Sequence, residues 1–195
     1  MTLLIGLCGP AGAGKSTIAK IISRRYGGLV IPIATPIKKM LEALGVDWRH
    51  LSGTPEEKEE ALDIFGGKSA RYAMQQLGTE FGRTNFGEDF WVNSWLRIVD
   101  GFKQYKLIVA DDVRFENEAR AIKDRGGIVI CVVRSYDDFD RTPSHASEDF
   151  SKVPEDALAL NNGSAERLEE VVSYIMHIVL KDKPIRPFSS EFPFP

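Results

Sequence analysis

Gly9-Pro10-Ala11-Gly12-Ala13-Gly14-Lys15-Ser16 is the most informative segment of this chain. The stretch satisfies the P-loop pattern, in which a glycine, four further residues and a second glycine precede a lysine and a hydroxyl residue. Small residues let the backbone wrap a phosphate closely, so that its N–H groups and the dipole of the next helix face the anion. A glycine-rich turn that matches by chance is the alternative interpretation.

The residues on either side supply the context that the pattern requires. Leu3 to Cys8 form a continuous apolar run, typical of a buried central strand. Ile18, Ile21 and Ile22 then share one face of a predicted helix over residues 16–26. A strand, a glycine-rich loop and a helix in this order favour a genuine ATP site. We assign its contacts to Gly9, Pro10, Ala11, Gly12, Ala13, Gly14, Lys15, Ser16 and Thr17.

Short apolar runs alternate with helix-period segments along the rest of the chain, and this alternation predicts an α/β fold. We expect a three-layer fold with a mostly parallel five-stranded sheet and helices on both faces. The further predicted strands cover residues 29–33, 106–110, 127–133 and 157–160. The further predicted helices cover residues 36–44, 69–83, 91–102, 115–122 and 164–179, with a short capped helix after Thr54.

The length of 195 residues fits one domain, which we place at residues 1–180. Within it we expect a helical acceptor-binding region over residues 35–103 and a polar lid over residues 134–153. Residues 181–195 form a segment rich in proline and phenylalanine, which cannot be helical and which suggests a homodimer.

Composition excludes several classes of protein. Hydrophobic residues make up 43% of the chain and charged residues 27%, as in ordinary globular proteins. No apolar run approaches the ~20 residues needed to cross a bilayer, and no basic segment precedes the first apolar run. The net charge of -3, without a dense basic block, argues against a nucleic-acid partner. We therefore expect a cytoplasmic protein that binds small ligands.

The cysteines and histidines do not form a metal-binding pattern. Cys8 and Cys131 lie in apolar runs and are predicted to be core residues. His50, His145 and His177 are scattered, so structural zinc is not expected.

The apolar run at residues 106–110 delivers Asp111 and Asp112 at its carboxyl end, where a parallel sheet binds its ligands. A P-loop needs an acid to organise Mg²⁺, and the metal site is therefore predicted at Ser16, Asp111 and Asp112. Aspartates after a strand also cap helices, which is the alternative role.

A second stripe lies on the predicted helix of residues 69–83. Arg71, Gln75, Gly78 and Gly82 share one face, and glycine lowers helix stability by about 1 kcal/mol relative to alanine. We interpret the glycines as room for a ligand on this face rather than as part of a solvated surface. Thr79 and Arg83 flank the same face.

Arg134 and Arg141 bracket the polar segment and are candidates to stabilise a transferring phosphoryl group. Surface arginines are common, so a role in solvation is the alternative. His145 lacks a nucleophile elbow nearby and is interpreted as a polar loop contact. Trp91 shares helical spacing with Trp95, which by itself indicates a core residue.

Several motifs together resemble the deoxynucleoside monophosphate kinases found chiefly in bacteriophages, and the resemblance covers residues 3–180. Beside the P-loop, its motifs are Arg71 to Arg83, Gly87-Glu88-Asp89-Phe90-Trp91-Val92, Asp112-Val113-Arg114-Phe115-Glu116-Asn117-Glu118 and His145-Ala146-Ser147-Glu148.

The resemblance implies transfer of the ATP γ-phosphoryl group to the 5′-phosphate of a deoxynucleoside monophosphate. It favours Asp112 over Asp111 for the metal, although the family more often has a small residue at position 111. It also places Arg114 beside the phosphates, with Lys15, Arg134 and Arg141 as the other catalytic candidates. The acceptor would meet Lys38, Arg71, Gln75, Gly78, Thr79, Arg83, Trp91 and His145.

Two other classes of function remain open at this point. The first is a P-loop kinase for another small phosphorylated acceptor, such as phosphomevalonate or dephospho-coenzyme A. The second is a nucleotide switch or an ATPase, although the Asn-Lys-x-Asp guanine motif of a GTPase is absent from the sequence. Neither the base of the acceptor nor its deoxyribose preference follows from the sequence.

Overall fold

The computed structural model describes residues 2–140 and 150–182 of the chain. These residues divide between two compact units. Unit 1 comprises the described residues within Met1–Pro32 and Val99–Pro195, and unit 2 comprises Ile33–Ile98. Unit 2 covers nearly the same stretch as the predicted acceptor-binding region of residues 35–103.

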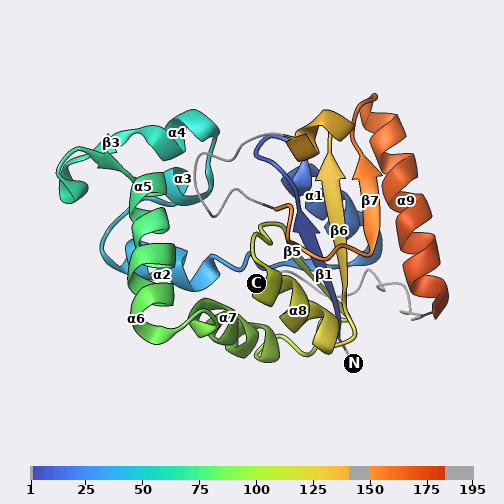
Figure 1. The fold of residues 1–195 in the computed structure, drawn as a ribbon, viewed down its shortest axis with the longest axis horizontal. Coiled ribbons are helices and arrows are strands. Elements are labelled where there is room, and N and C mark those ends of the chain that lie inside the picture. The colour runs from blue at the N-terminus through green and yellow to red at the C-terminus, as the bar shows by residue number, and fades with distance from the viewer. Residues whose placement is uncertain (1, 141–149, 183–195) are drawn as a thin grey trace. The chain divides into compact units, whose positions relative to one another are not determined.

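Unit 1 is built on the predicted parallel sheet. All four neighbouring strand pairs run parallel, so the sheet is parallel throughout. This confirms the predicted fold class. Figure 1 shows β1 at the centre of the sheet. The strand order is β2 (Leu29–Val30), β5 (Leu107–Ala110), β1 (Leu3–Cys8), β6 (Ile128–Val133) and β7 (Ala157–Leu160).

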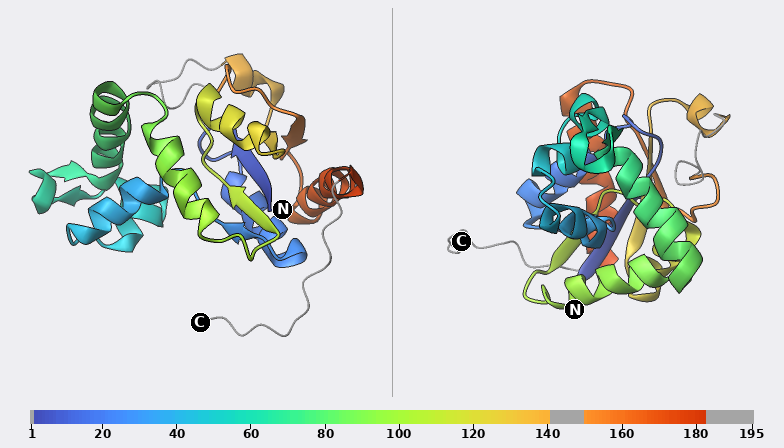
Figure 2. Two further views of the ribbon diagram at one scale, coloured as in Figure 1. Left: turned by 90° about the horizontal axis from the view of Figure 1, so that it is seen from below. Right: turned by 90° about the vertical axis from the view of Figure 1, so that its left-hand side faces the viewer.

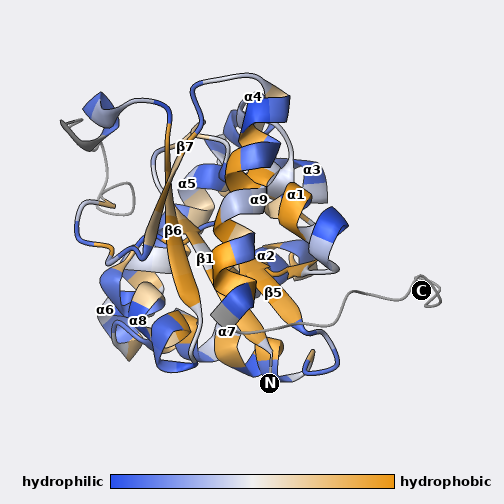
Figure 3. Cartoon of the chain, turned by 90° about the vertical axis from the view of Figure 1, so that its right-hand side faces the viewer, coloured by the Kyte–Doolittle hydropathy of each residue, from blue (hydrophilic) through white to orange (hydrophobic). Residues whose placement is uncertain are grey.

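Helices cover both faces of this sheet (Figures 1 and 2). Helices α1 (Lys15–Tyr26) and α9 (Ala165–Asp182) pack against one face, where their apolar side chains join those of the strands in one core. Helix α8 (Glu116–Asp124) packs against β1 and β6 on the other face. Figure 3 shows the hydrophobic colour concentrated on β1, β5 and β6, as expected for strands buried on both faces.

The alternation of side chains along β1 explains how both faces are filled. Ile5 and Leu7 belong to the core shared with α1 and α9. Gly6 faces the other way, and a Cβ atom there would lie 2.7 Å from Ile122 Cδ1 and 2.9 Å from Val113 Cγ2. The missing side chain therefore lets α8 pack closely on the central strand.

Unit 2 is mainly helical, and its core includes Ile37, Leu41, Leu51, Ala73 and Trp91. Thr54 and Glu57 form the predicted capping box at the start of α4. The elements are α2 (Thr35–Ala43), α3 (Trp48–Ser52), α4 (Pro55–Glu59), β3 (Ala61–Leu62), the 3₁₀ turn η1 (Asp63–Phe65), β4 (Lys68–Ser69), α5 (Ala70–Gln75), η2 (Gln76–Arg83), α6 (Thr84–Phe86) and α7 (Phe90–Asp100). Helix α7 ends just inside unit 1.

Two local predictions are wrong. The segment of residues 69–83 is not one α-helix, because α5 continues into the π-helix η2. A π-helix has wider turns, so a stripe drawn at α-helical spacing drifts, and Phe81 is 44% exposed. The polar segment after β6 begins with the 3₁₀-helix η3 (Tyr136–Asp140) rather than with an irregular loop.

No helix in residues 2–140 and 150–182 combines the length and the apolar character needed to cross a bilayer.

Candidate functional site

The phosphate-binding loop begins where β1 meets β6. Gly9 has a φ of +123°, and a Cβ atom there would lie 2.0 Å from the carbonyl oxygen of Val132. Only glycine has both the backbone freedom and the small size that this position requires. Gly14 also has a positive φ, and a Cβ atom there would lie 2.3 Å from Asn161 Nδ2. Two glycines of the motif are thus fixed by contacts with the neighbouring strand ends.

Lys15 folds back over the loop. Its Nζ donates hydrogen bonds of 2.7 Å to the carbonyl oxygens of Gly9 and Pro10. Burial, and next the charge of Arg114, lower the pKa of Lys15 to about 8 against the opposing effects of Asp111 and Asp112. The ammonium is therefore a partly desolvated cation at the mouth of the loop, which is the state that favours an anionic ligand.

Ser16 contacts the first of the two aspartates. Its Oγ donates a hydrogen bond of 2.7 Å to Asp111 Oδ2. The contact forms because β5 and β1 are parallel neighbours, so that the residue after β5 reaches the start of α1. Both aspartates are half-buried, and both act on the pKa of Lys15. The hydrogen bond favours Asp111 over Asp112 as the partner of Ser16, in contrast to the preference that the resemblance implied.

A buried glutamate fixes the segment that carries Arg114. Glu118 is 5% exposed, and its Oε2 accepts hydrogen bonds from the backbone N–H groups of Arg114 and Phe115, at 2.8 Å and 3.2 Å. The two N–H groups lie at the start of α8, where a carboxylate is stabilised by the helix dipole. Glu118 thus holds the exposed Arg114 at a fixed place, close enough for its charge to affect Lys15.

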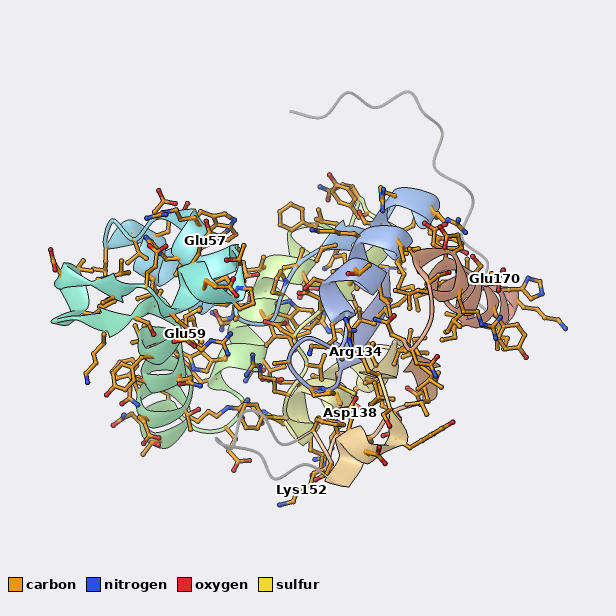
Figure 4. All side chains as sticks on the ribbon, turned by 90° about the horizontal axis from the view of Figure 1, so that it is seen from above. Glu57, Glu59, Arg134, Asp138, Lys152 and Glu170 are labelled. Atoms are coloured by element: carbon orange, nitrogen blue, oxygen red, sulfur yellow. The ribbon has the colours of Figure 1, made fainter. Side chains whose placement is uncertain are left out.

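Arg134 contacts the tip of the P-loop. Its Nε donates a hydrogen bond of 3.0 Å to the carbonyl oxygen of Gly12. Asp138, which is 3% exposed, accepts hydrogen bonds from the backbone N–H groups of Arg134 and Ser135 and so fixes the end of β6. Figure 4 labels Arg134 and Asp138, and the side chain of Arg134 is exposed. Arg141 and His145 lie outside the described residues.

Asn161 contacts the P-loop and was not predicted from the sequence as a site residue. Its Nδ2 donates a hydrogen bond of 2.8 Å to the carbonyl oxygen of Ala13, and its backbone N–H donates to Val133. It also limits the space beside Gly14. Its place directly after a predicted strand could have revealed it, since Asp111 was found by the same reasoning. Asn161 and Arg134 therefore hold two consecutive carbonyl groups of the P-loop, those of Ala13 and Gly12.

Apart from His145, the acceptor-side candidates lie in unit 2, and Lys38, Arg71 and Arg83 among them are basic. Arg71 Nε lies 2.8 Å from Glu59 Oε1, at ion-pair distance, but this buried nitrogen has no aligned hydrogen-bond partner among the described residues. Lys38 Nζ donates a hydrogen bond of 3.0 Å to Ser52 Oγ and lies 5.7 Å from the centre of the Trp48 ring. Gln75 and Thr79 are half-buried, and Arg83 Nη1 donates to the carbonyl of Glu88 at 3.1 Å.

The glycine stripe of this unit has a different explanation from the one predicted. A Cβ atom at Gly82 would lie 2.0 Å from Trp91 Nε1, so the space beside Gly82 is filled by an indole. Trp91 is 4% exposed, and its Nε1 donates a hydrogen bond of 2.9 Å to the carbonyl oxygen of Gly78. The inference that the glycines make room for a ligand is therefore wrong at Gly82. The position of Trp91 agrees with the core role that its helical spacing indicates.

Matches to known proteins identify the family of this chain. Residues 46–172 match the model of the family described as deoxynucleotide monophosphate kinase. The chain belongs to the deoxynucleotide monophosphate kinase family. A provisionally named member from Acanthamoeba polyphaga mimivirus is 31% identical over 190 residues, which cover 91% of this chain and 96% of the relative. The family match begins after the P-loop, so the loop is a nucleotide-binding motif outside the matched residues.

Solved structures also resemble this kinase at the level of the backbone. Shikimate kinase from Acinetobacter baumannii, in complex with shikimate, has a TM-score of 0.49 and 15% identity and covers 95% of this chain and 97% of its own. Shikimate kinase from Bacteroides thetaiotaomicron has a TM-score of 0.45 and 14% identity, over 91% and 98% of the two chains. The family membership rests on the sequence matches alone.

We predict that Gly82→Ala destabilises the kinase by about 1–3 kcal/mol, because the added methyl group would overlap the indole of Trp91. Gly78→Ala is the matched control, since its Cβ atom would lie 3.4 Å from Ile37 Cδ1, an ordinary contact. The control should be neutral or up to about 1 kcal/mol more stable, because alanine favours helix. Urea unfolding measures both variants, and equal stability of the two would contradict the role given to Trp91.

We also predict that Asn161→Ala weakens the binding of inorganic tripolyphosphate by about fivefold, since a lost hydrogen bond of about 1 kcal/mol leaves the Ala13 carbonyl unfixed. Asn162→Ala is the control, because this neighbouring asparagine is exposed. Calorimetric titration of both variants with tripolyphosphate measures its affinity directly, and no acceptor nucleotide is needed. Equal affinities of wild type and Asn161→Ala would show that the loop keeps its shape without this side chain.

Proposed function

We propose that this chain transfers the γ-phosphoryl group of ATP to the 5′-phosphate of a deoxynucleoside monophosphate and releases the two diphosphates. The observation that carries the proposal is the P-loop with Lys15 at its mouth and Ser16 bonded to Asp111, in a member of this family. Phosphoryl transfer requires little covalent chemistry from the protein, so positioning and positive charge supply most of the rate enhancement.

The residues of the loop can perform the donor half of this reaction. The backbone N–H groups of the P-loop would bind the β- and γ-phosphates, with the N-terminal dipole of α1 directed at them. Lys15 would exchange its two carbonyl contacts for phosphate oxygens, and Arg114 and Arg134 would add positive charge from two neighbouring segments. Charge that develops on the transferring group would then be stabilised without rearrangement of the protein.

The oxygen atoms of Ser16 and Asp111 fit a Mg²⁺ ion. Both are hard ligands, they lie 2.7 Å apart, and Asp112 is adjacent in sequence. In residues 2–140 and 150–182, no group of three or more histidine, cysteine, aspartate or glutamate side chains could hold a metal ion. Mg²⁺ does not need such a group, because it is commonly held by one or two carboxylates together with phosphates and water. Bound there, it would neutralise charge on the β- and γ-phosphates.

Unit 2 would supply the acceptor contacts. Arg71 is the strongest candidate for the monophosphate, because its buried Nε lacks an aligned partner while its side chain is 32% exposed. A phosphate could replace Glu59 as its partner, and phosphate accepts two parallel hydrogen bonds from a guanidinium. Lys38, Gln75, Thr79 and Arg83 are the other contacts that we propose.

We predict that the purified protein, given Mg²⁺, ATP and a panel of deoxynucleoside monophosphates, forms the corresponding diphosphates, and that Lys15→Ala lowers the rate by about 10³. Asp111→Asn should raise the Mg²⁺ concentration needed for half-maximal rate more than Asp112→Asn does, because Asp111 contacts Ser16. Chromatography of the nucleotides measures the products. Phosphate release that is indifferent to every acceptor would sink the kinase proposal.

The acceptor panel should include phosphomevalonate and dephospho-coenzyme A, so that a kinase for another small acceptor is detected. It should also compare dGMP with GMP, since an aromatic side chain can exclude a ribose 2′-hydroxyl. Tyr72 is 45% exposed and available for this role, whereas the indole N–H of Trp91 is already bonded to Gly78. Equal rates with dGMP and GMP would rule out such a filter.

We predict that ATP binding weakens as the pH rises through about 8, because the pKa of Lys15 in the free chain is about 8 and a neutral amine binds phosphate poorly. At that pH, binding should take up protons, which makes the calorimetric enthalpy depend on the buffer. The unfolded chain keeps this proton up to its ordinary pKa of 10.5. The contribution of Lys15 to folding stability therefore rises between pH 8 and 10.5. The Lys15→Ala variant should lack both pH effects. An unchanged pH profile in that variant would show that another group causes them.

A further inference from the structure

An apolar groove with a volume of about 740 Å³ runs between β7 and α9 in unit 1. Three of its large apolar side chains are exposed, with Tyr174 at 68%, Ile178 at 47% and Leu158 at 37% of their surface. Arg167 and Glu170, which form an ion pair, lie at one end of the groove, and Figure 4 labels Glu170 on α9. A contiguous apolar surface with a polar rim is typical of an interaction site.

Helix α9 carries more apolar residues than the core of unit 1 uses. Leu168, Val172 and Met176 are buried against α1 and the sheet. Tyr174 and Ile178 lie beside this stripe and line the groove instead. An amphipathic helix normally exposes a polar face, so the second apolar stripe indicates that something else packs on it.

Strand β7 adds a second reason for a cover. It is an edge of the five-stranded sheet, and among the described strands it pairs only with β6. Figure 1 shows β7 and α9 next to each other at this edge. An open sheet edge beside exposed apolar side chains invites aggregation, and proteins commonly cover such an edge with a loop.

The sequence that follows α9 has the composition and the length to provide this cover. Residues 183–195 read KPIRPFSSEFPFP and contain Phe188, Phe192 and Phe194. The segment leaves α9 at Asp182, one turn after Ile178. Extended, its residues reach about 40 Å, whereas α9 from Arg167 to Asp182 is about 23 Å long. The prolines exclude a regular ladder with β7 but suit an extended polyproline segment along a groove.

We propose that residues 183–195 turn back along α9 and bind in the groove between α9 and β7, with their phenylalanines covering Tyr174 and Ile178. The segment stabilises α9 and shields the sheet edge. Its role does not depend on the catalytic proposal, because no residue of the P-loop lines the groove. The occupant is this segment rather than a second copy of the chain, because it is tethered at the end of the helix that lines the groove, which gives it a high effective concentration.

The first test places a nitroxide label at Ser189→Cys in the full chain and records its effect on backbone amide signals by NMR. Cys8 and Cys131 are 0% and 1% exposed and will not react with the label under native conditions. We expect strong broadening of the amides of Leu158, Tyr174 and Ile178. Absence of broadening at these residues would overturn the proposal. Broadening that appears only between labelled and unlabelled copies in a mixed sample would identify a second copy as the occupant and would also overturn it.

The second test compares hydrogen exchange of α9 in the full chain and in a variant with Phe188→Ser, Phe192→Ser and Phe194→Ser. We expect amide exchange in the C-terminal half of α9 to become at least about tenfold faster, and the binding of a hydrophobic dye to rise, since the groove loses its cover. Ile178→Glu should have the same effect, and combining it with the triple change should add little. Tyr136→Ser is the control, because Tyr136 is 65% exposed on η3, outside the groove.

The two tests together decide between the occupants. If the triple variant exchanges like wild type, the phenylalanines do not cover the groove and the proposal is wrong. Addition of a peptide of residues 183–195 to the triple variant should restore protection of α9. Kinase activity should stay unchanged in the triple variant, so that a failure of this proposal is distinguishable from a failure of the catalytic one.

Discussion

Close contact between backbone groups at the carboxyl edge of the sheet is the constraint on which the site depends. Gly9 lies so near the Val132 carbonyl that no side chain fits between them, and this contact requires β1 and β6 to be adjacent and parallel. The neighbouring strands then deliver Asp111 and Asn161 to the same loop. The parallel order of the strands therefore gives this glycine-rich loop a fixed shape.

Opposing effects act on the proton of Lys15, and those that disfavour it are stronger. Burial and Arg114 disfavour its proton, while Asp111 and Asp112 favour it. The segments of the two arginines near the loop are held by buried carboxylates: Glu118 fixes the segment of Arg114, and Asp138 fixes the segment of Arg134. The positive groups are therefore held in place by the protein itself, and under the proposed function little reorganisation would be needed during transfer.

In unit 2 the sequence correctly indicated that two glycines have a structural role, but the predicted reason for that role was wrong at Gly82. The glycines at positions 78 and 82 are unusual in a helical segment, and the sequence suggested that a ligand fills their space. The indole of Trp91 fills the space at Gly82 and bonds to Gly78. Spacing along a helix shows where room exists, but it does not show which distant side chain uses it.

The sequence was sufficient to predict the P-loop, the central strand Leu3–Cys8, a strand at Ala157–Leu160 and the parallel α/β class of the fold. It did so because these features depend on residues close together in the chain: an apolar run, a glycine spacing, a helical period. The short hairpin of β3 and β4 and the π-helix η2 were not predicted from the sequence, since few local residues specify them. Only the tertiary structure decided that Asp111 meets Ser16, that Asn161 meets Ala13 and that Trp91 covers Gly82. Each of these contacts joins residues from different elements, and the packing of those elements sets the distances between them.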